Sequence, residues 1–235
     1  MKNYVLVHGA WEGSWAWEDV TSLLEKRGDK AIAVDLPGSY GNMQPVSETT
    51  LESYIKTTTE AIAKLDGKVT LVAHSLGGAT ISQIAERMPE KIERLVYVAS
   101  FLLKNGGSIL EAMQSDKEGQ ILPELTVSED QSYATVTEPV WRRVAFHDAT
   151  EGAIKRALPR LAERQALAPL VAKLELTEER FGSVPKHFIH GDLDKMTTPW
   201  LQNQMVKNWP VERVDHLRSG HFPTLSVPAE VAALL

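Results

Sequence analysis

Short apolar runs alternate along the chain with longer segments in which apolar residues recur at helical spacing. The runs cover residues 5–7, 31–34, 69–73, 95–99 and 187–189. They are continuous, contain many β-branched residues and end in turn residues, which is typical of strands buried on both faces of a sheet. Helical spacing occurs between them, over residues 15–27, 51–65 and 77–87. This alternation predicts an α/β fold in which helices flank a mostly parallel central sheet.

The alternation stops between residues 103 and 180 and resumes at Val184. The intervening stretch is rich in Glu, Lys, Ala and Leu, shows no strong strand pattern and is divided into short pieces by four prolines. We therefore predict a core formed by residues 1–102 and 181–235, into which residues 103–180 are inserted as a helical cap. A last helix is expected over residues 228–235, and the sequence leaves open whether the native chain continues beyond Leu235.

The composition of the 235 residues is that of an ordinary globular domain, with 43% hydrophobic and 24% charged residues. A net charge of −6 without a block of like charges argues against nucleic acid or an anionic membrane as a partner. The absence of cysteine excludes disulfides, thiolate nucleophiles and cysteine-ligated metals. Because no other metal-ligand spacing is present either, we expect neither a metal nor another cofactor.

The apolar run near Met1 is too short and too polar for a signal peptide. No stretch approaches the ~20 apolar residues that a membrane span requires. We therefore expect a cytoplasmic protein whose partner is a small molecule, and the sequence leaves the formation of a homodimer open.

The strongest chemical signal is the turn between the predicted strand 69–73 and the predicted helix 77–87. It reads Ala73-His74-Ser75-Leu76-Gly77-Gly78. A sharp strand-to-helix turn needs small residues two places before and two places after its centre, and it exposes the central side chain. Ser75 is therefore the candidate nucleophile, although Ala73 replaces the more common Gly. The alternative is a helix start at which Ser75 is only a capping residue.

A serine hydroxyl becomes a good nucleophile when a base accepts its proton and a third group orients the base. Among the seven histidines we favour His221 as the base. It follows the last strand-like run, 211–217, in a turn that we expect at the same sheet edge as Ser75. His187 and His216 fall inside predicted strands, and His74 is expected to shape the turn beside Ser75.

The orienting acid is expected in the loop after the strand 187–189, which contains both Asp192 and Asp194. We favour Asp194 because it lies deeper in the loop, while Asp192 is suited to bonding its own backbone in the turn. The choice between the two carboxylates stays open. The oxyanion that forms on an attacked carbonyl needs two backbone N–H donors. We assign them to Leu76, at the start of the helix, and to Ala10, in the loop after the first strand.

Four stretches resemble the branch of α/β hydrolases that contains the plant salicylate-binding methylesterases, the hydroxynitrile lyases and related bacterial esterases. They are residues 5–11, 13–17, 73–78 and 178–184, and the similarity extends over nearly the whole chain, including the cap. The resemblance implies the α/β-hydrolase fold and the family's triad of Ser75, Asp194 and His221, in its order of nucleophile, acid and histidine. It also implies Ala10 and Leu76 as the oxyanion donors.

Two positions distinguish the lyases of this branch from its esterases. The lyases carry Thr where this chain has Gly9, to hold the cyanohydrin hydroxyl, and Lys where it has Phe222, to stabilise the departing cyanide. We therefore predict a serine carboxylesterase that hydrolyses small, largely apolar esters through an acyl-enzyme. The alternatives are a hydroxynitrile lyase, a cofactor-free oxygenase or perhydrolase with the same triad, and a small-molecule receptor on the same fold.

The substrate pocket is expected between the sheet edge and the cap, where it would hold a small apolar acyl or aryl group. Its candidate lining residues are Trp11, Phe101, Leu102, Leu122, Trp141 and Phe222. The alternative role for each of these side chains is ordinary core packing.

Overall fold

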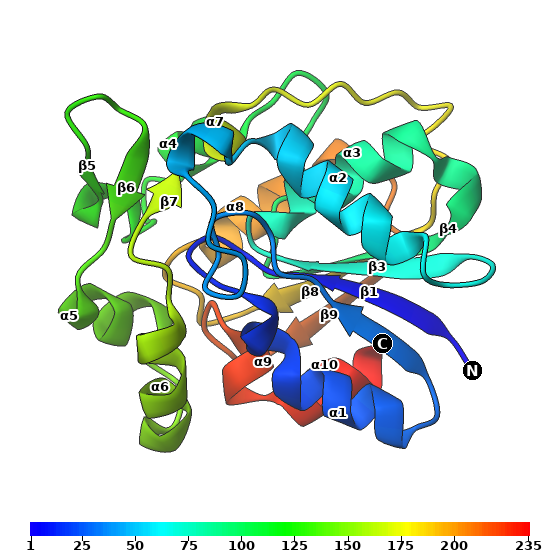
Figure 1. Cartoon of the computed structure of the whole chain (residues 1–235), viewed down its shortest axis with the longest axis horizontal. Helices are drawn as coiled ribbons and strands as arrows, with labels where there is room; N and C mark the ends of the chain where they lie inside the picture. Colours follow the sequence, from blue (N-terminus) through cyan, green and yellow to red (C-terminus); the bar gives the residue numbers. More distant parts are fainter.

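The computed structural model describes residues 1–235 and is built around a six-stranded sheet. All neighbouring strands of this sheet are parallel, in the order β2-β1-β3-β4-β8-β9 (Figure 1). The strands are β1 (Asn3–Val7), β2 (Lys30–Ala33), β3 (Val69–His74), β4 (Ile92–Val98), β8 (Lys186–Gly191) and β9 (Arg213–Leu217). The predicted α/β fold with a parallel central sheet is thus confirmed.

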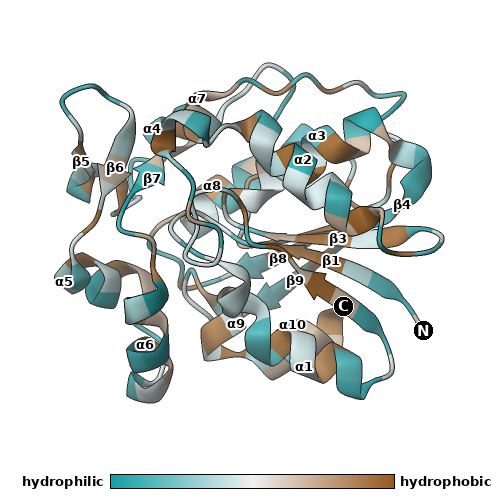
Figure 2. Ribbon diagram, in the orientation of Figure 1, coloured by the Kyte–Doolittle hydropathy of each residue, from teal (hydrophilic) through white to brown (hydrophobic).

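Helices cover both faces of the sheet. On one face lie α2 (Leu51–Ile62), α3 (Gly77–Arg87) and α8 (Pro199–Met205), and on the other lie α1 (Glu18–Lys26), α9 (Pro223–Ser226) and α10 (Pro228–Leu234) (Figure 1). Alternate side chains of a strand enter the two cores, as the two-residue period of a strand requires. On β1, Val5 and Val7 pack toward α2 and α3, whereas Tyr4 and Leu6 pack toward α1 and α10. Strands β1 and β3 are accordingly largely hydrophobic in Figure 2.

The helix bounds agree closely with the sequence pattern. Helix α3 spans the predicted residues 77–87, α2 ends three residues before the predicted end, and the predicted helix 15–27 is divided into a 3-10 turn and α1. The 3-10 turns of the chain are Ser14–Trp17, Val46–Glu48, Pro89–Lys91, Leu122–Glu124, Leu158–Arg160 and Val206–Asn208. None of the helices combines the length and the apolar composition that crossing a bilayer requires.

The segment between β4 and β8, which includes the cap (residues 103–180), contains strands as well as helices. Its helices are α4 (Ile109–Ser115), α5 (Glu138–Val140) with a π-helical turn (Trp141–Ala145), α6 (Glu151–Ala157) and α7 (Ala168–Val171). Its strands β5 (Thr126–Val127), β6 (Tyr133–Thr135) and β7 (Gln165–Ala166) form a separate antiparallel sheet. The expected helices are present, but these strands were not predicted, because strands of two or three residues are too short to produce an alternating pattern.

The carboxyl ends of the parallel strands meet at one edge of the sheet. The loops that follow β1, β3, β8 and β9 leave from this edge, and the cap elements lie beside it (Figure 1). In open parallel sheets, such an edge is the usual place for a ligand site.

Candidate active site

The turn from β3 into α3 holds Ser75 in a left-handed backbone conformation, with φ of 48°. Two glycines permit the close packing of this turn. A Cβ atom on Gly77 would lie 2.8 Å from the backbone oxygen of His8, and one on Gly78 would lie 2.4 Å from that of Phe101. Any larger residue at either position would push α3 away from the neighbouring strand ends, so the sequence Gly77-Gly78 fixes where Ser75 points.

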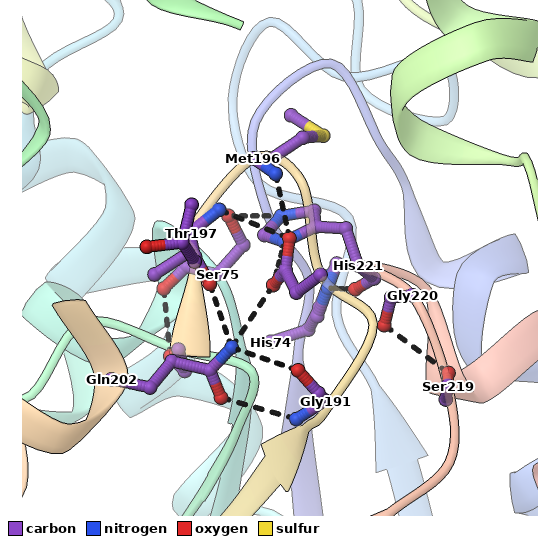
Figure 3. A network of polar contacts seen from close by, with 12 residues as sticks. His74, Ser75, Gly191, Met196, Thr197, Gln202, Ser219, Gly220 and His221 are labelled. Atoms are coloured by element: carbon purple, nitrogen blue, oxygen red, sulfur yellow. Dashed lines mark hydrogen bonds and ion pairs between the residues drawn. The ribbon is translucent and has the colours of Figure 1, made fainter. Parts of the chain in front are cut away.

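Three side chains from three different loops form a continuous hydrogen-bonded chain at the sheet edge (Figure 3). The Oγ atom of Ser75 lies 3.0 Å from Nε2 of His221, and Nδ1 of the same ring lies 2.7 Å from Oδ2 of Asp194. All three side chains are buried. The structure thus brings together the three residues that the sequence analysis assigned to nucleophile, base and acid.

The carboxylate of Asp194 is held from both sides. Its Oδ1 accepts hydrogen bonds from the backbone N–H groups of Met196 at 2.7 Å and Thr197 at 3.0 Å, and the side-chain amide of Gln202 donates to Oδ2 at 3.3 Å (Figure 3). Asp192 points elsewhere and pairs with the exposed ring of His216 at 2.7 Å. Of the two carboxylates that the sequence left open, only Asp194 contacts His221.

The two backbone groups assigned to the oxyanion, Ala10 and Leu76, lie on the same pocket as Ser75 and His221. Neither N–H group donates a hydrogen bond within the protein. Leu76 directly precedes α3, so its N–H group belongs to the positive end of the helix. Two free donors beside a serine hydroxyl can stabilise a negatively charged oxygen.

The pocket at Ser75 is mostly apolar and small, with a volume of about 30 Å³. Trp11 and Phe101 line it, as the sequence analysis expected. The residues that sequence reasoning missed come mainly from the cap and from the loop after β8: Ile109, Met113, Ile121, Leu125, Leu170, Met196 and Thr197. Their apolar spacing indicates only that they are buried, and gives no sign of which surface they share.

Four other expected lining residues do not lie on this pocket. Leu102 is fully buried in the main core, and Leu122 lines a separate apolar groove between α4, α7 and the β5–β6 hairpin. Trp141 packs edge-on behind Trp11, with 5.5 Å between ring centroids. Phe222 packs against the rings of His74 and Phe146. The prediction was wrong for these four because neighbouring side chains, which the local sequence does not reveal, separate them from the pocket.

A second buried pair lies next to this chain of residues, and sequence reasoning did not find it. Nδ1 of His74 lies 2.7 Å from Oε1 of Glu12, in the loop after β1, and Nε2 of the same ring lies 2.6 Å from the backbone oxygen of His221. Burial opposes the charged form of both partners, but their mutual attraction outweighs it. The pKa of Glu12 is therefore lowered and the pKa of His74 is raised.

For His8, the residue before Gly9, burial is the stronger effect, and the ring is neutral. Its Nε2 accepts a hydrogen bond from the backbone of Leu36 at 3.1 Å, and burial lowers its pKa. No group of three or more His, Cys, Asp or Glu side chains is arranged to hold a metal ion.

Known proteins resemble this chain over nearly its whole length. Residues 4–234 match the alpha/beta hydrolase family. Methylesterase 7 of Arabidopsis thaliana is 30% identical, over 100% of this chain and 95% of its own length. A chloroplastic protein of the same plant, named as a methylesterase, is 32% identical to this chain. The chain spans only 63% of the length of that protein.

Solved structures show the same fold. Polyneuridine aldehyde esterase superposes with a TM-score of 0.89 at 25% identity, covering 100% of this chain and 97% of its own. A pyrethroid hydrolase from Sphingobium faniae superposes with a TM-score of 0.88 at 25% identity, covering 99% and 95%. These values show that both proteins share the overall fold of this chain.

Proposed function

The chain belongs to the alpha/beta hydrolase family, and on this premise we propose that it is a serine carboxylesterase for small, largely apolar carboxylic esters. The observation that carries the proposal is the unbroken chain from Ser75 Oγ through His221 to Asp194, with distances of 3.0 and 2.7 Å. It ends at an apolar pocket beside two free N–H donors. The names of the similar methylesterases, the aldehyde esterase and the pyrethroid hydrolase support ester hydrolysis.

In the first half of the reaction, His221 removes the proton of Ser75 while Oγ attacks the ester carbonyl carbon. The carbonyl oxygen becomes negative, and the N–H groups of Ala10 and Leu76 stabilise it. When the tetrahedral intermediate collapses, the alkoxy group leaves with the proton from His221, and the acyl group remains on Ser75.

In the second half, a water molecule takes the place of the alcohol. His221 removes its proton, the resulting hydroxide attacks the acyl-enzyme, and Ser75 recovers its proton as the carboxylic acid departs. Asp194 keeps the Nε2 atom of His221 directed at Ser75 and stabilises the imidazolium that forms in each step.

The surroundings of the site favour hydrolysis over cyanohydrin cleavage. A Cβ atom on Gly9 would lie 2.4 Å from Oε1 of Glu12 and 2.8 Å from Cβ of Ser75, so a threonine has no room there. Phe222 is buried among aromatic rings, where a lysine ammonium would lose its hydration. The surroundings of positions 9 and 222 therefore suit neither of the two groups that a lyase of this branch uses.

The first test is hydrolysis of p-nitrophenyl acetate, butyrate and octanoate by the wild type and by Ser75→Ala. We expect turnover in the wild type and a loss of roughly 10³-fold or more in the variant. Ser183→Ala, which alters an exposed serine near the amino end of β8, serves as the matched control and should retain full activity. Because the pocket is small, acetate and butyrate should react faster than octanoate.

Equal rates in wild type and Ser75→Ala, or no hydrolysis by either, would contradict the esterase proposal. Cyanide release from a cyanohydrin would then indicate the lyase, and oxygen uptake would indicate the oxygenase. A single turnover followed by tight product retention would indicate the receptor.

A further inference from the structure

The buried pair of Glu12 and His74 lies against the proposed reacting groups, although neither side chain takes part in the proposed proton transfer. The side chains are 1% and 0% exposed. A buried acid and base of this kind are costly unless each has hydrogen-bonding partners. We therefore look at the hydrogen-bonding partners of His74 to find the role of the pair.

Both nitrogens of the His74 ring face acceptors. The backbone oxygen of His221, 2.6 Å from Nε2, can only accept a hydrogen bond, so Nε2 must carry a hydrogen. The carboxylate of Glu12 faces Nδ1 at 2.7 Å, and the shifted pKa values of the two groups favour the ion pair. His74 is thus an imidazolium that donates to Glu12 on one side and to the main chain of His221 on the other.

Glu12 also touches the loop that carries an oxyanion donor. The 2.4 Å separation between a hypothetical Cβ on Gly9 and Oε1 shows that the carboxylate packs directly against the backbone of this loop, one residue before Ala10. His74 is the neighbour of Ser75 in the chain. One ion pair therefore joins the loops after β1, β3 and β9, which supply the oxyanion donor, the nucleophile and the base.

We propose that Glu12 and His74 are positioning residues for the ester hydrolysis, holding the main chain of His221 and the loop of Ala10 in place relative to Ser75. This inference rests on the proposed function. Asp194 fixes the His221 ring through Nδ1, and His74 fixes the same residue through its carbonyl oxygen. Neither Glu12 nor His74 lines the pocket at Ser75, so the pair acts on the rate of reaction and not on substrate binding.

The pair also affects the charge that develops on His221. The rings of His74 and His221 are 4.8 Å apart, and Glu12 binds the opposite nitrogen of His74, so the positive end of the pair faces His221. The imidazolium of His74 therefore lies close to the ring on which positive charge develops in the proposed reaction. The other titratable groups around this residue are Asp194 at Nδ1, His8 behind Glu12, and His147 and Asp148 beside Gly220.

The test compares Glu12→Leu with Glu12→Gln. Leucine cannot orient His74, so kcat should fall roughly 10- to 100-fold, the cost of a small misplacement of reacting groups, with KM within about twofold. Glutamine can donate to Nδ1 and leave the hydrogen on Nε2, so Glu12→Gln should recover most of kcat. Because buried His74 then loses its charge, the acidic limb of kcat/KM should move to higher pH by roughly half a unit.

The matched control is Asp215→Asn, which removes the carboxylate from another buried histidine. His187 and Asp215 are 2.7 Å apart on β8 and β9, and His187 lies near the amino end of the sheet, away from the site. This variant should lower the melting temperature and leave kcat and the acidic limb unchanged. All rates are expressed per active serine, titrated with a fluorophosphonate that reacts covalently with Ser75.

Two results would overturn the inference: an unchanged kcat in Glu12→Leu, or an unmoved acidic limb in Glu12→Gln. If Glu12→Leu does not fold, the pH profile of Glu12→Gln decides alone. The rate of fluorophosphonate labelling also depends on His221 and the oxyanion donors, but not on ester turnover. A wild type that is labelled without hydrolysing esters would therefore contradict the proposed function, while the labelling rates of the variants would still test the pair.

Discussion

Backbone strain is concentrated at the residues around Ser75. Four residues other than glycine have positive φ, and three of them, Trp11, Ser75 and Ala99, follow strands at the carboxyl edge of the sheet. Each such conformation costs of order 1–3 kcal/mol and persists only when its surroundings enforce it. Here the hydroxyl of Ser100, the residue after Ala99, donates to the backbone oxygen of Ser75 at 2.7 Å. The strand ends thus hold the serine side chain in an orientation that an isolated loop would not keep.

At the same scale, the two neighbouring carboxylates should differ sharply in their effect on catalysis. Asp194→Asn keeps the shape of the side chain but favours the wrong tautomer of His221, so kcat should fall by roughly 10³- to 10⁴-fold. Asp192→Asn, which changes only the exposed contact with His216, should stay within about twofold of the wild type. Steady-state hydrolysis of p-nitrophenyl acetate measures both. A larger loss in Asp192→Asn than in Asp194→Asn would reverse the assignment.

At the scale of elements, the sequence predicted those helices and strands whose formation depends on their own residues. Strand β3 and helix α3 were found because their buried faces produce regular patterns and their junction is marked by Gly77 and Gly78. The contact between Glu12 and His74 joins residues 62 positions apart, and nothing near either residue indicates it. The same holds for the pocket walls, because which apolar residues of the cap face Ser75 depends on how α4, α7 and the short strands pack.

Two of the helical glycines, Gly78 and Gly152, should respond in opposite ways to alanine. On α3, the added Cβ of Gly78→Ala would meet the backbone oxygen of Phe101 at 2.4 Å, so we expect a loss of about 1–3 kcal/mol from overpacking. On α6, the nearest atom to a Cβ on Gly152 is Oγ1 of Thr150 at 3.9 Å. Gly152→Ala should therefore stabilise the protein by about 0.5–1 kcal/mol through helix propensity.

Urea denaturation of both variants checks this pair of predictions. A stabilised Gly78→Ala would show that α3 can move away from the strand ends without cost. That result would contradict the close packing that we hold responsible for the position of Ser75.

At the scale of the whole molecule, buried histidines link stability to pH. His190 on β8 is 1% exposed, and burial together with repulsion from His216 lowers its pKa to about 4. The unfolded chain binds this proton near the ordinary pKa of about 6.5. The stabilisation is therefore complete above pH 6.5 and is lost as the pH falls from there to about 4.

We expect the free energy of unfolding to decrease between pH 7 and pH 4.5. In His190→Phe this decrease should be less steep, because unfolding then takes up roughly one proton fewer. Urea titrations of the wild type and the variant at several pH values give the slope directly. An equal slope in both proteins would show that His190 is protonated in the folded state well above pH 4.

The segment between β4 and β8 enters and leaves the core at only two points of the chain. It supplies the pocket residues Ile109, Met113, Ile121, Leu125 and Leu170, whereas Ser75, Asp194, His221 and the N–H donors all come from outside it. An exchange of this one stretch between descendants of a common ancestor would reshape one wall of the pocket and leave the proposed reacting groups in the chain unchanged. Natural selection can therefore change which small molecules such a protein binds without changing the groups that react with them.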